Sequence, residues 1–475
     1  MNCPYNFFLL NLAGIRFNFK QLTRLSMKRF SGILNILISV LIILLLVSCK
    51  ECPTEPKPID YNLQLSVRFQ GCKSIKFNLS SADSTREKIW VLNRDGQFIS
   101  SDTLYGSDTV ITDNTVSVDN TYKYQALFYN KSDNFLDSST TLEVVMLPST
   151  SHEFTWELDT IGYSGDLWDV FAISENDVWV VGTFEIEEPD TVIGTEKTQC
   201  NAAHWDGEEW IKYQIPVDYR GYIWPDPLYS VYGFSADEVY FLSHTRLVLW
   251  NGSEFIQMTD FLDDPTMWAV NTLWARSSTD LYAGGVRGYM VATDGLTVNP
   301  VPKFTELGIR EIVGDSYNKL WVTADNVTGD GEFHYFDGDQ WQKMWDVDNL
   351  FYPFSGPLGY EYLQTDALFP IDDSYIVMMV GGNNAMVVIH SQDDFNDYDI
   401  LFFLEKGWWR AIDGNGINDF FGVGNSTLAT HFNGTSYQNY PEISIGSFWE
   451  GVDQIGDYAF IVGNPAGPVV AIGKR

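Results

Sequence analysis

The chain has 475 residues, with 63 acidic against 29 basic side chains and a net charge of −34. Residues 1–48 hold five of the basic side chains and no acidic one, so the remainder carries 24 basic against 63 acidic. Such an acidic surface repels polyanions and excludes nucleic acid as a partner. Aromatic residues make up 15% of the chain and charged residues only 19%, which excludes an intrinsically disordered protein.

The first predicted element is an export signal. Gly32–Val47 is an uncharged run of sixteen residues that follows Lys28-Arg29. It is shorter than the roughly 20 residues of a membrane-spanning helix and is typical of a signal peptide. We therefore predict a signal peptide over residues 27–48 and regard residues 1–26 as an extension upstream of the true start at Met27. The alternative is a signal-anchor helix that stays in the membrane.

The end of this run, Leu46-Val47-Ser48-Cys49, resembles the lipobox of bacterial lipoproteins. The resemblance implies that Cys49 is acylated and tethers the chain to a membrane. Lys50-Glu51 behind it resembles the surface-export signal of Bacteroidota lipoproteins, although Cys52 takes the place of the second acid. We expect the outer membrane and the cell surface, with a periplasm-facing anchor as the alternative.

The remaining cysteines point to a disulfide rather than to redox chemistry. Cys49 and Cys52 form a C-x-x-C pair, but lipidation explains Cys49 better than a redox site does. Cys52 and Cys72 are the candidate disulfide in an oxidising compartment, and Cys200 is then free or buried. No cysteine cluster has the spacing of a zinc site, and we predict no metal. Residues 49–60, rich in proline, form a short stiff linker.

Residues 61–148 alternate polar and apolar residues over several short runs and are predicted to form a small β-sandwich. Asp95-Gly96 is a hairpin turn between two of these runs. The Tyr-x-Tyr-x-Ala run at Tyr122, followed by a final run rich in serine and threonine, resembles a fibronectin type III domain. The resemblance implies that Tyr122 is the tyrosine-corner residue, that Trp90 lies in the core, and that the domain is a spacer or docking module.

Residues 152–475 contain seven repeats of about 40 residues, which indicate a seven-bladed β-propeller. Each repeat starts with an apolar run and reaches a second run, usually led by Asp or Asn, about nine residues later. The repeats start at Leu167, Leu228, Met267, Ile309, Gln364, Trp409 and Trp449. Most continue to an Asp-Gly or Asn-Gly turn followed by an aromatic residue, so each predicts four short antiparallel strands, as in a blade. These units resemble Trp-Asp-Gly repeat propellers, which are mostly interaction platforms.

The predicted fold is therefore all-β: a small β-sandwich followed by a propeller that an N-terminal strand closes. The last repeat ends near Gly473 without an outer strand, and residues 153–159 have the composition of the missing strand. We expect this segment to complete the last blade and so to cover an open sheet edge.

Three long connections are predicted to share one face of the propeller: residues 184–200, 217–227 and 346–362. Aromatic rings on loops above a rigid scaffold suit sugar faces or protein hot spots. The candidate ligand-binding residues are Tyr219, Arg220, Tyr222, Trp224, Phe351, Tyr352 and Tyr360. The alternative is that these side chains only pack the loops against the propeller.

No catalytic residue set is predicted. His204, His334, His390 and His431 recur just before the second turn of their repeats, which is typical of a packing position. No phosphate-binding glycine loop or nucleophile elbow is present. Calcium at the acidic stretches 325–330 and 393–399 is an alternative to simple solvation of these loops, although neither stretch matches the EF-hand loop. We predict no cofactor.

These observations favour a membrane-anchored, non-catalytic binding or scaffold lipoprotein of the cell envelope. Its expected ligand is a glycan or another envelope protein, bound at the loop-rich propeller face. The alternative is a glycan-active propeller enzyme, a hydrolase or lyase, for which two carboxylates with raised pKa values should face each other in the central funnel. A purely structural component of an envelope assembly is the third hypothesis.

Overall fold

The structure is a computed structural model of the whole chain. It divides into two units, Met1–Tyr61 and Asn62–Arg475. The described residues are 61–187, 197–260, 269–326, 331–346, 365–372, 375–380, 385–389, 398–403, 409–425, 428–443, 448–465 and 467–475. They form strands and two short 3-10 turns, η2 (Val286–Gly288) and η4 (Pro441–Ile443), with no α-helix among them. No helix within these ranges is long and apolar enough to cross a membrane. The predicted signal peptide and Cys49 lie outside them.

The first eight strands form two antiparallel sheets. One sheet has the order β1-β2-β5, from β1 (Gln64–Gln70), β2 (Ile75–Ser80) and β5 (Asp108–Asp113). The other has the order β4-β3-β6-β7, with β8 also paired to β6. Its strands are β3 (Lys88–Arg94), β4 (Gln97–Leu104), β6 (Thr121–Tyr129), β7 (Phe135–Ser138) and β8 (Leu142–Val145).

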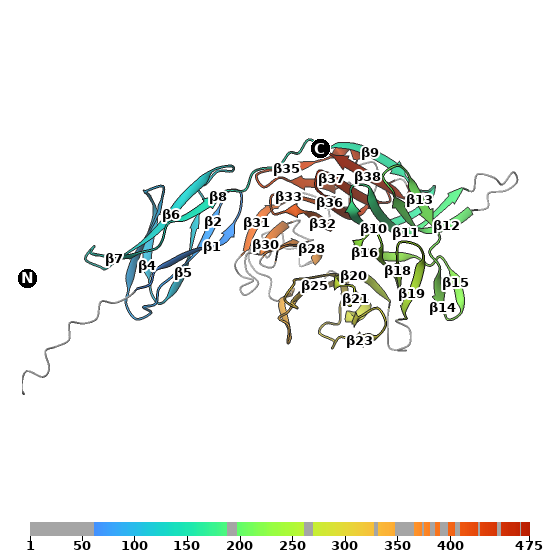
Figure 1. Cartoon of the computed structure of the whole chain (residues 1–475), viewed down its shortest axis with the longest axis horizontal. Helices are drawn as coiled ribbons and strands as arrows, with labels where there is room; N and C mark the ends of the chain where they lie inside the picture. The colour runs from blue at the N-terminus through green and yellow to red at the C-terminus, as the bar shows by residue number, and fades with distance from the viewer. Residues whose placement is uncertain are drawn as a thin grey trace, which may run out of the picture. The chain divides into compact units, whose positions relative to one another are not determined.

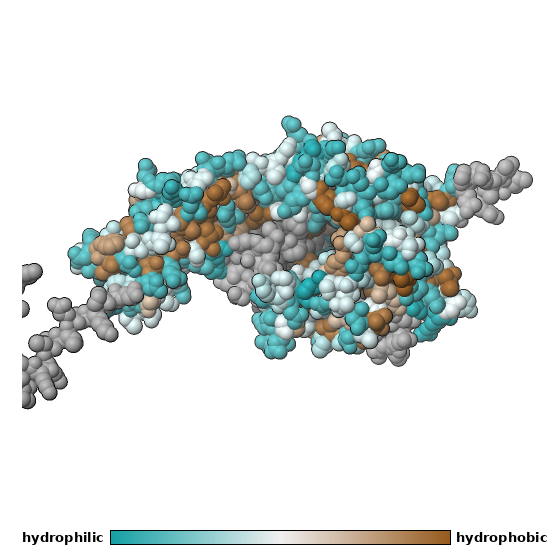
Figure 2. All heavy atoms as spheres, viewed as in Figure 1, coloured by the Kyte–Doolittle hydropathy of each residue, from teal (hydrophilic) through white to brown (hydrophobic). Residues whose placement is uncertain are grey.

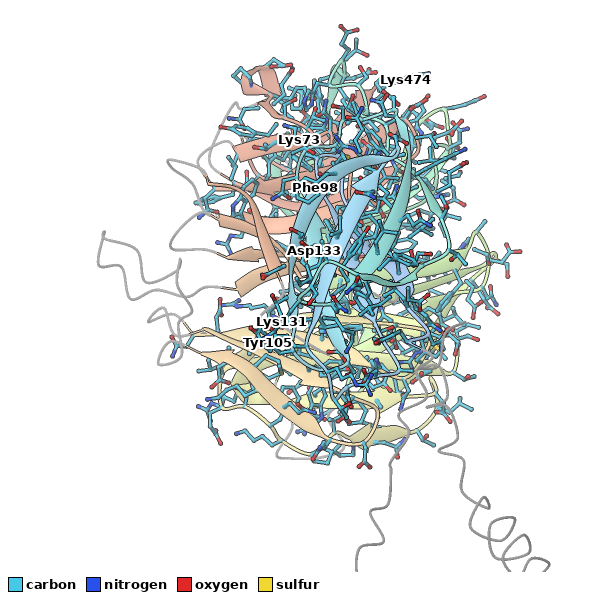
Figure 3. All side chains as sticks on the ribbon, turned by 90° about the vertical axis from the view of Figure 1, so that its left-hand side faces the viewer. Lys73, Phe98, Tyr105, Lys131, Asp133 and Lys474 are labelled. Carbon is cyan, nitrogen blue, oxygen red and sulfur yellow. The ribbon has the colours of Figure 1, made fainter. Side chains whose placement is uncertain are left out.

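The two sheets share buried aromatic side chains. The ring of Phe77 on β2 lies 4.6 Å from that of Tyr124 on β6, and both side chains are fully buried. The hydroxyl of Tyr122 accepts a hydrogen bond from the backbone N–H of Ser117 at 3.1 Å. Trp90 is buried, whereas Phe98 and Tyr105 are exposed at and just beyond β4 (Figure 3).

Seven four-stranded antiparallel sheets follow within the described part of the chain. The first two are β10 (Ser164–Ser174), β11 (Asp177–Glu187), β12 (Lys197–Trp205), β13 (Trp210–Tyr213), and β16 (Leu228–Ser235), β17 (Glu238–Ser243), β18 (Arg246–Trp250), β19 (Phe255–Asp260). The next two are β20 (Val270–Ser277), β21 (Asp280–Gly285), β22 (Met290–Thr293), β23 (Val298–Pro300), and β24 (Gly308–Gly314), β25 (Leu320–Asp325), β26 (Gly331–Phe336), β27 (Trp341–Asp346). The fifth is β28 (Thr365–Asp372), β29 (Tyr375–Val380), β30 (Ala385–Ile389), β31 (Tyr398–Phe403). The last two are β32 (Trp409–Gly416), β33 (Asp419–Gly424), β34 (Leu428–Phe432), β35 (Tyr437–Asn439), and β36 (Trp449–Ile455), β37 (Tyr458–Gly463), β38 (Val469–Lys474), β9 (Thr155–Thr160).

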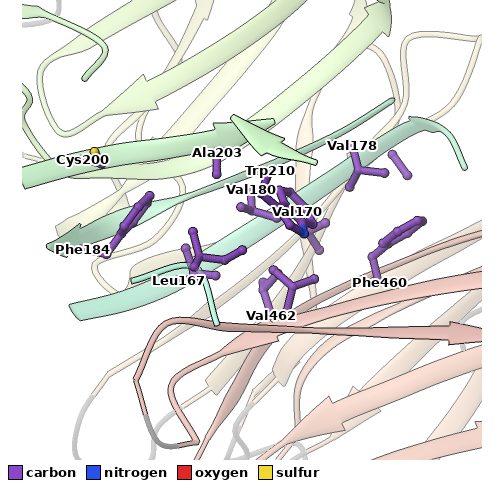
Figure 4. Close-up of a cluster of buried hydrophobic side chains, with 13 residues drawn as sticks. Leu167, Val170, Val178, Val180, Phe184, Cys200, Ala203, Trp210, Phe460 and Val462 are labelled. Carbon is purple, nitrogen blue, oxygen red and sulfur yellow. The ribbon is translucent and has the colours of Figure 1, made fainter. Parts of the chain in front are cut away.

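The first strand of each sheet packs against the first strand of the next, and β36 packs against β10 (Figure 1). These first strands are called the inner strands below. Apolar side chains fill the space between neighbouring sheets. Between the first and last sheets, Leu167, Val178 and Val462 are fully buried and belong to one apolar cluster (Figure 4). The described residues thus have a propeller-like arrangement of antiparallel sheets.

The second turn of the repeats shows why it needs Asn or Asp before Gly. In the second sheet, the side-chain Oδ1 of Asn251 accepts the backbone N–H groups of Ser253 and Glu254 at 3.0 and 2.9 Å. Gly252 between them has φ = +84°, a conformation that side chains with a Cβ rarely adopt. The polar residue closes the turn and the glycine permits its backbone path.

The closure predicted for residues 153–159 is confirmed, with the strand one or two residues later. β9 pairs antiparallel with β38 in an unbroken register from Thr155↔Lys474 to Thr160↔Val469. Phe154, just before β9, is buried among the rings of Phe421 and Tyr440. An N-terminal segment therefore completes the C-terminal sheet and covers the edge of β38.

Candidate functional site

The inner strands surround a pocket of about 570 Å³. Its described lining comes from β10, β16, β20, β24, β32 and β36, together with Asp325 at the end of β25 and Asn425 just after β33. The wall carries aromatic, cationic and acidic side chains. A concave site with a few converging polar groups is the usual form of a binding site.

Every inner strand carries a β-bulge near its beginning. In each case the pairing register with the second strand skips one residue, for example Trp168 between Leu167 and Asp169. The seven skipped residues are Trp168, Tyr229, Asn271, Arg310, Asp366, Arg410 and Glu450. All of them except Asp366, whose side chain lies outside the described set, line the pocket. We call these six residues the rim. Bulges redirect side chains and recur beside functional sites.

One arc of the rim is aromatic. The rings of Trp168 and Tyr229 stack at 4.6 Å with 2° between their planes. The imidazole of His244 stacks on Tyr229 at 3.7 Å, and its Nδ1 lies 3.0 Å from the carbonyl oxygen of Val270. Burial raises the pKa of Tyr229, so its phenol stays protonated at neutral pH. Both faces of the Tyr229 ring are thus covered by neighbouring rings.

The opposite arc is cationic. Arg310 donates through Nε to the buried carboxylate of Asp325. Arg410 donates through Nε to Asn425 Oδ1 at 3.1 Å and lies 3.7 Å from Glu450 Oε2. The two arginine side chains are 38% and 41% exposed. Because a guanidinium has five N–H donors, each arginine keeps N–H groups that these contacts do not use.

Three aspartates on the pocket wall join consecutive inner strands, and we call them the latch aspartates. Asp413 on β32 accepts the backbone N–H of Gln454 on β36 at 2.8 Å. Asp453 on β36 accepts that of Ala172 on β10 at 2.8 Å. Asp169 on β10 accepts that of Val231 on β16 at 2.9 Å, and also the Ser230 hydroxyl at 2.8 Å. They cross three neighbouring junctions, including the junction between the last and first sheets.

Low solvation in the pocket favours the protonated form of these carboxyl groups. Burial raises the pKa of Asp169 to about 6 and that of Asp453 to about 7. Burial and the nearby Asp453 raise the pKa of Asp413 well above its usual value. Glu311, which has no cationic partner among the described residues, has its pKa raised to about 8 by burial and by the Asp169 charge. The pocket wall therefore changes charge near neutral pH.

The protein is expected to melt at a lower temperature as the pH rises from 5 to 9. The pKa values of Asp169, Asp453 and Glu311 in the folded protein lie above those of unfolded carboxyl groups. Their contribution to the free energy of unfolding is therefore largest below about pH 4, and it is lost as the pH rises to about 8. Asp453→Asn keeps an acceptor for Ala172 and should flatten this slope. Asp457→Asn, 70% exposed, serves as the control. Calorimetry across this range at constant ionic strength measures both; identical slopes for the wild type and Asp453→Asn would contradict the assignment.

Four of the predicted ligand-binding residues lie together on a hairpin outside the pocket. The segment expected as a loop at 217–227 forms β14 (Val217–Tyr219) and β15 (Tyr222–Trp224). Tyr222 is 73% exposed, so packing against the propeller does not explain it. Tyr219 and Trp224 are more than a third exposed, and Arg220 lies in the turn. The other three, Phe351, Tyr352 and Tyr360, lie outside the described residues.

Sequence reasoning did not find the rim. Its residues differ in chemistry from repeat to repeat, so no residue type recurs there. The available signal was positional: each rim residue directly follows the first apolar residue of its inner strand, as in Leu167-Trp168 and Leu228-Tyr229. A bulge at a repeated position can be recognised only once the register of the strands is known.

Three of the recurrent histidines have carboxylate partners. His204 Nε2 lies 2.8 Å from Asp177 Oδ1, and His431 Nε2 lies 2.8 Å from Asp419 Oδ1. In both cases the imidazole on the third strand meets the aspartate that starts the second strand of the same sheet. His334 lies 2.9 Å from Glu332. These contacts agree with a packing position, and His390 lies outside the described residues.

The described part of the chain contains two cysteines, Cys72 and Cys200. Both are buried and form no disulfide with each other or with another described residue, and burial raises the pKa of each thiol to about 11. The pairing of Cys52 with Cys72 stays a prediction, because Cys52 lies outside the described residues. Within the described ranges, no group of three or more His, Cys, Asp or Glu side chains could hold a metal ion.

Comparisons with known proteins identify a similar fold but no family. No protein-family model matches the sequence, and no curated protein matches it. Among solved structures, "YCF48 bound to D1 peptide" is similar with a TM-score of 0.50 and 14% identity, over 69% of this chain and 99% of that chain. YCF48 from Cyanidioschyzon merolae has a TM-score of 0.47 and 12% identity, over 67% and 98%. The Pan2 WD40 domain of Neurospora crassa has 0.43 and 10%, over 69% and 97%. At these identities the first similarity supports a propeller fold alone.

Proposed function

We propose that this chain is a seven-bladed propeller that binds a segment of a protein partner at the rim. In this proposal, the lipid on Cys49 anchors the chain to the outer membrane at the cell surface. A fibronectin type III-like sandwich over residues 61–148 separates the propeller from the anchor. A Cys49→Ser variant should no longer be found in the membrane fraction, which cell fractionation measures. If the variant and the wild type are distributed equally between the membrane and soluble fractions, the proposed anchor is wrong.

The observation that carries the proposal is the ring of bulges around the pocket. A bulge leaves one residue of a strand out of the hydrogen-bonded ladder, and here it recurs in all seven inner strands. The result is an aromatic arc opposite two half-exposed arginines above a cavity. Binding, rather than stability, is the simplest reason for placing such different side chains at one repeated position.

The chemistry of the rim favours a peptide over a glycan. A sugar ring binds to an open aromatic face, but Trp168 and His244 cover both faces of Tyr229. Guanidinium donors instead suit the carbonyl and carboxylate oxygens of a polypeptide. The similar YCF48 structure is bound to a peptide, which supports a protein partner for this chain as well.

Replacing both rim arginines should abolish most of the binding. We expect Arg310→Gln/Arg410→Gln to weaken a peptide ligand at least about tenfold, because hydrogen bonds to charged groups contribute about 1.5–3 kcal/mol each. Residues 59–475 would be screened on a peptide array and on a glycan array, and hits titrated against wild type and variant. Lys212→Gln, on the outer strand β13, is the control. Glycan hits without peptide hits, or peptide binding that the double variant retains, would refute the proposal.

A glycan-active enzyme is the second candidate, and one observation favours it. Asp413 and Asp453 interact in the pocket and have raised pKa values, as the enzyme hypothesis requires. However, their carboxyl groups hydrogen-bond each other, whereas the carboxyl pairs of glycosidases lie roughly 5–9.5 Å apart. Each also holds a backbone N–H of the next inner strand. Turnover of a glycan substrate that Asp453→Asn abolishes without loss of stability would establish the enzyme.

A further inference from the structure

The β14–β15 hairpin lies in the connection between the first and second propeller sheets. Its register pairs Tyr219 with Tyr222 around a two-residue turn, Arg220-Gly221. Both turn residues have positive φ, +52° and +88°, as a type I′ hairpin turn requires. The N–H of Gly221 donates to Asp218 Oδ1 at 2.7 Å and closes the turn. The hairpin is therefore a defined element and not an irregular loop.

Side chains of the second sheet hold the first leg of the hairpin. Asp218 pairs with Ile223 one step beyond the pair that flanks the turn, so its N–H and C=O point away from β15. Gln257 on β19 accepts this N–H at 3.3 Å, and Arg246 on β18 donates to this carbonyl oxygen. Gln257 also donates to the carbonyl oxygen of Pro216. The outward edge of β14 is thus satisfied.

The first sheet holds the other leg at its base. Gln199 on β12 donates to the carbonyl oxygen of Pro225 at 3.2 Å, and Asn201 donates to that of Asp226 at 2.8 Å. The indole N–H of Trp224 donates to Asp226 Oδ1 at 3.2 Å. Because both legs are already held in place, less conformational entropy of the hairpin is lost when a partner binds.

No described residue covers the outward edge of β15 in this way. By the same register, the N–H and C=O of Ile223 point away from β14, and neither has a hydrogen-bond partner among the described residues. The Ile223 side chain is 69% exposed and that of the neighbouring Tyr222 is 73% exposed. Figure 2 shows hydrophobic surface residues in the region where Figure 1 labels β14 and β15. Among the described residues, side chains cap one edge of the hairpin, whereas the other edge has no hydrogen-bond partner and carries the exposed Tyr222 and Ile223 side chains.

We propose that β15 is a docking edge for an extended segment of a protein partner, which pairs with Ile223 as a third strand. A neighbouring N–H and C=O on an extended backbone match the spacing of another peptide chain, which is the basis of recognition by strand addition. The exposed Tyr222 and Ile223 side chains favour an apolar segment. Because the chain carries a net charge of −34, the segment should be neutral or basic. This inference rests on the proposed protein-binding function and adds a contact surface distinct from the rim.

The test uses the full chain and an array of random twelve-residue peptides. Ile223→Pro removes the outward N–H, which the hairpin itself does not use, and proline is tolerated on strand edges. Ile223→Val keeps the N–H and is the matched control. We expect peptides that bind the wild type and Ile223→Val equally and Ile223→Pro at least about tenfold more weakly, a loss typical of one or two hydrogen bonds. Equal binding to all three would overturn the inference.

Hydrogen exchange on the wild type provides a second readout that needs no variant. Bound peptide should slow exchange of the Ile223 amide, whereas unchanged exchange on saturation would overturn the inference. The two proposals fail separately. Peptides sensitive to Arg310→Gln/Arg410→Gln but not to Ile223→Pro would leave the rim function and remove the edge. Peptides with the opposite sensitivity would leave the edge and remove the rim. No peptide binding at all would overturn both.

Discussion

A chain that begins at Asp166 is expected to melt at least about 10 °C below a chain that begins at Pro148, and to aggregate. The two differ only in residues 148–165, which include β9. Removing β9 breaks six pairings with β38 and leaves an apolar strand edge open to other molecules. It also removes Phe154, whose ring contacts Phe421, and burial of one such ring alone stabilises by about 3–5 kcal/mol.

Calorimetry and light scattering on the two chains measure this difference. Both lack the first 147 residues, so loss of the N-terminal sheets cancels between them. A narrower variant, Phe154→Ala in the full chain, should lower the melting temperature by less than the truncation does. Equal melting temperatures for the two truncated chains would show that β9 pairs with β38 without stabilising the propeller-like sheets.

Asp419→Ala should cost about 3–5 kcal/mol of folding free energy, the cost of removing one partner from a buried ion pair. Asp419 is 4% exposed and starts β33. Its carboxylate accepts hydrogen bonds from His431 at 2.8 Å and from Arg475 at 2.7 Å. Burial alone would raise its pKa, but the bonds from His431 and Arg475 outweigh burial and hold the pKa well below its usual value. In the alanine variant, the buried N–H groups of His431 and Arg475 lose their acceptor.

The control for Asp419 lies on the same arginine. Asp457 contacts Arg475 Nε at 3.2 Å but is 70% exposed, so Asp457→Ala should cost less than about 1 kcal/mol. Asp419 stabilises the protein above about pH 4, and this contribution is lost as the pH falls through its depressed pKa. Urea unfolding at pH 7 compares the variants. Equal costs for Asp419→Ala and Asp457→Ala would mean that the buried cluster contributes nothing beyond a surface pair.

Both predictions concern the region where the segment around β9 contacts the C-terminal end of the chain. His152, in the segment that leads into β9, lies 2.8 Å from His431 through the two Nδ1 atoms, and its backbone carbonyl oxygen accepts the Tyr440 hydroxyl. Burial and the neighbouring His431 and Arg475 lower the pKa of His152 to about 4, so it is neutral at pH 7. Asp419 accepts hydrogen bonds from Arg475, which directly follows β38, and from His431 on β34. Residues 150–160 and the C-terminal strand therefore meet at a single polar cluster.

Much of the fold was predictable because it depends on local, repeated chemistry. Asn251-Gly252 and its counterparts predict a turn wherever they occur, since only such residues close it at positive φ. Seven repeats of alternating apolar residues predict the seven four-stranded sheets. The last repeat lacked one strand, so counting predicted that residues 153–159 complete the last sheet, and residues 155–160 do so.

The candidate sites were less predictable, because they depend on contacts between distant repeats. The aromatic residues Tyr222 and Trp224 were identified from the sequence, but not their place on a hairpin with one open edge. That edge depends on Gln257 and Arg246, more than twenty residues away, covering the other leg. Arg310 and Arg410 belong to different repeats and share the rim only after the inner strands assemble.

The sequence alone predicts an export signal over residues 27–48, and it determines the all-β repeat pattern and the strand that completes the last sheet. Each of these depends on composition, spacing or count along one stretch of chain. The tertiary structure alone decides the rim of bulge residues, the latch aspartates and the open edge of β15. A bulge is defined by a partner strand, and a raised pKa by surroundings that exclude water. A free backbone edge is defined by which neighbours fail to cover it, and none of these three is a property of a segment by itself.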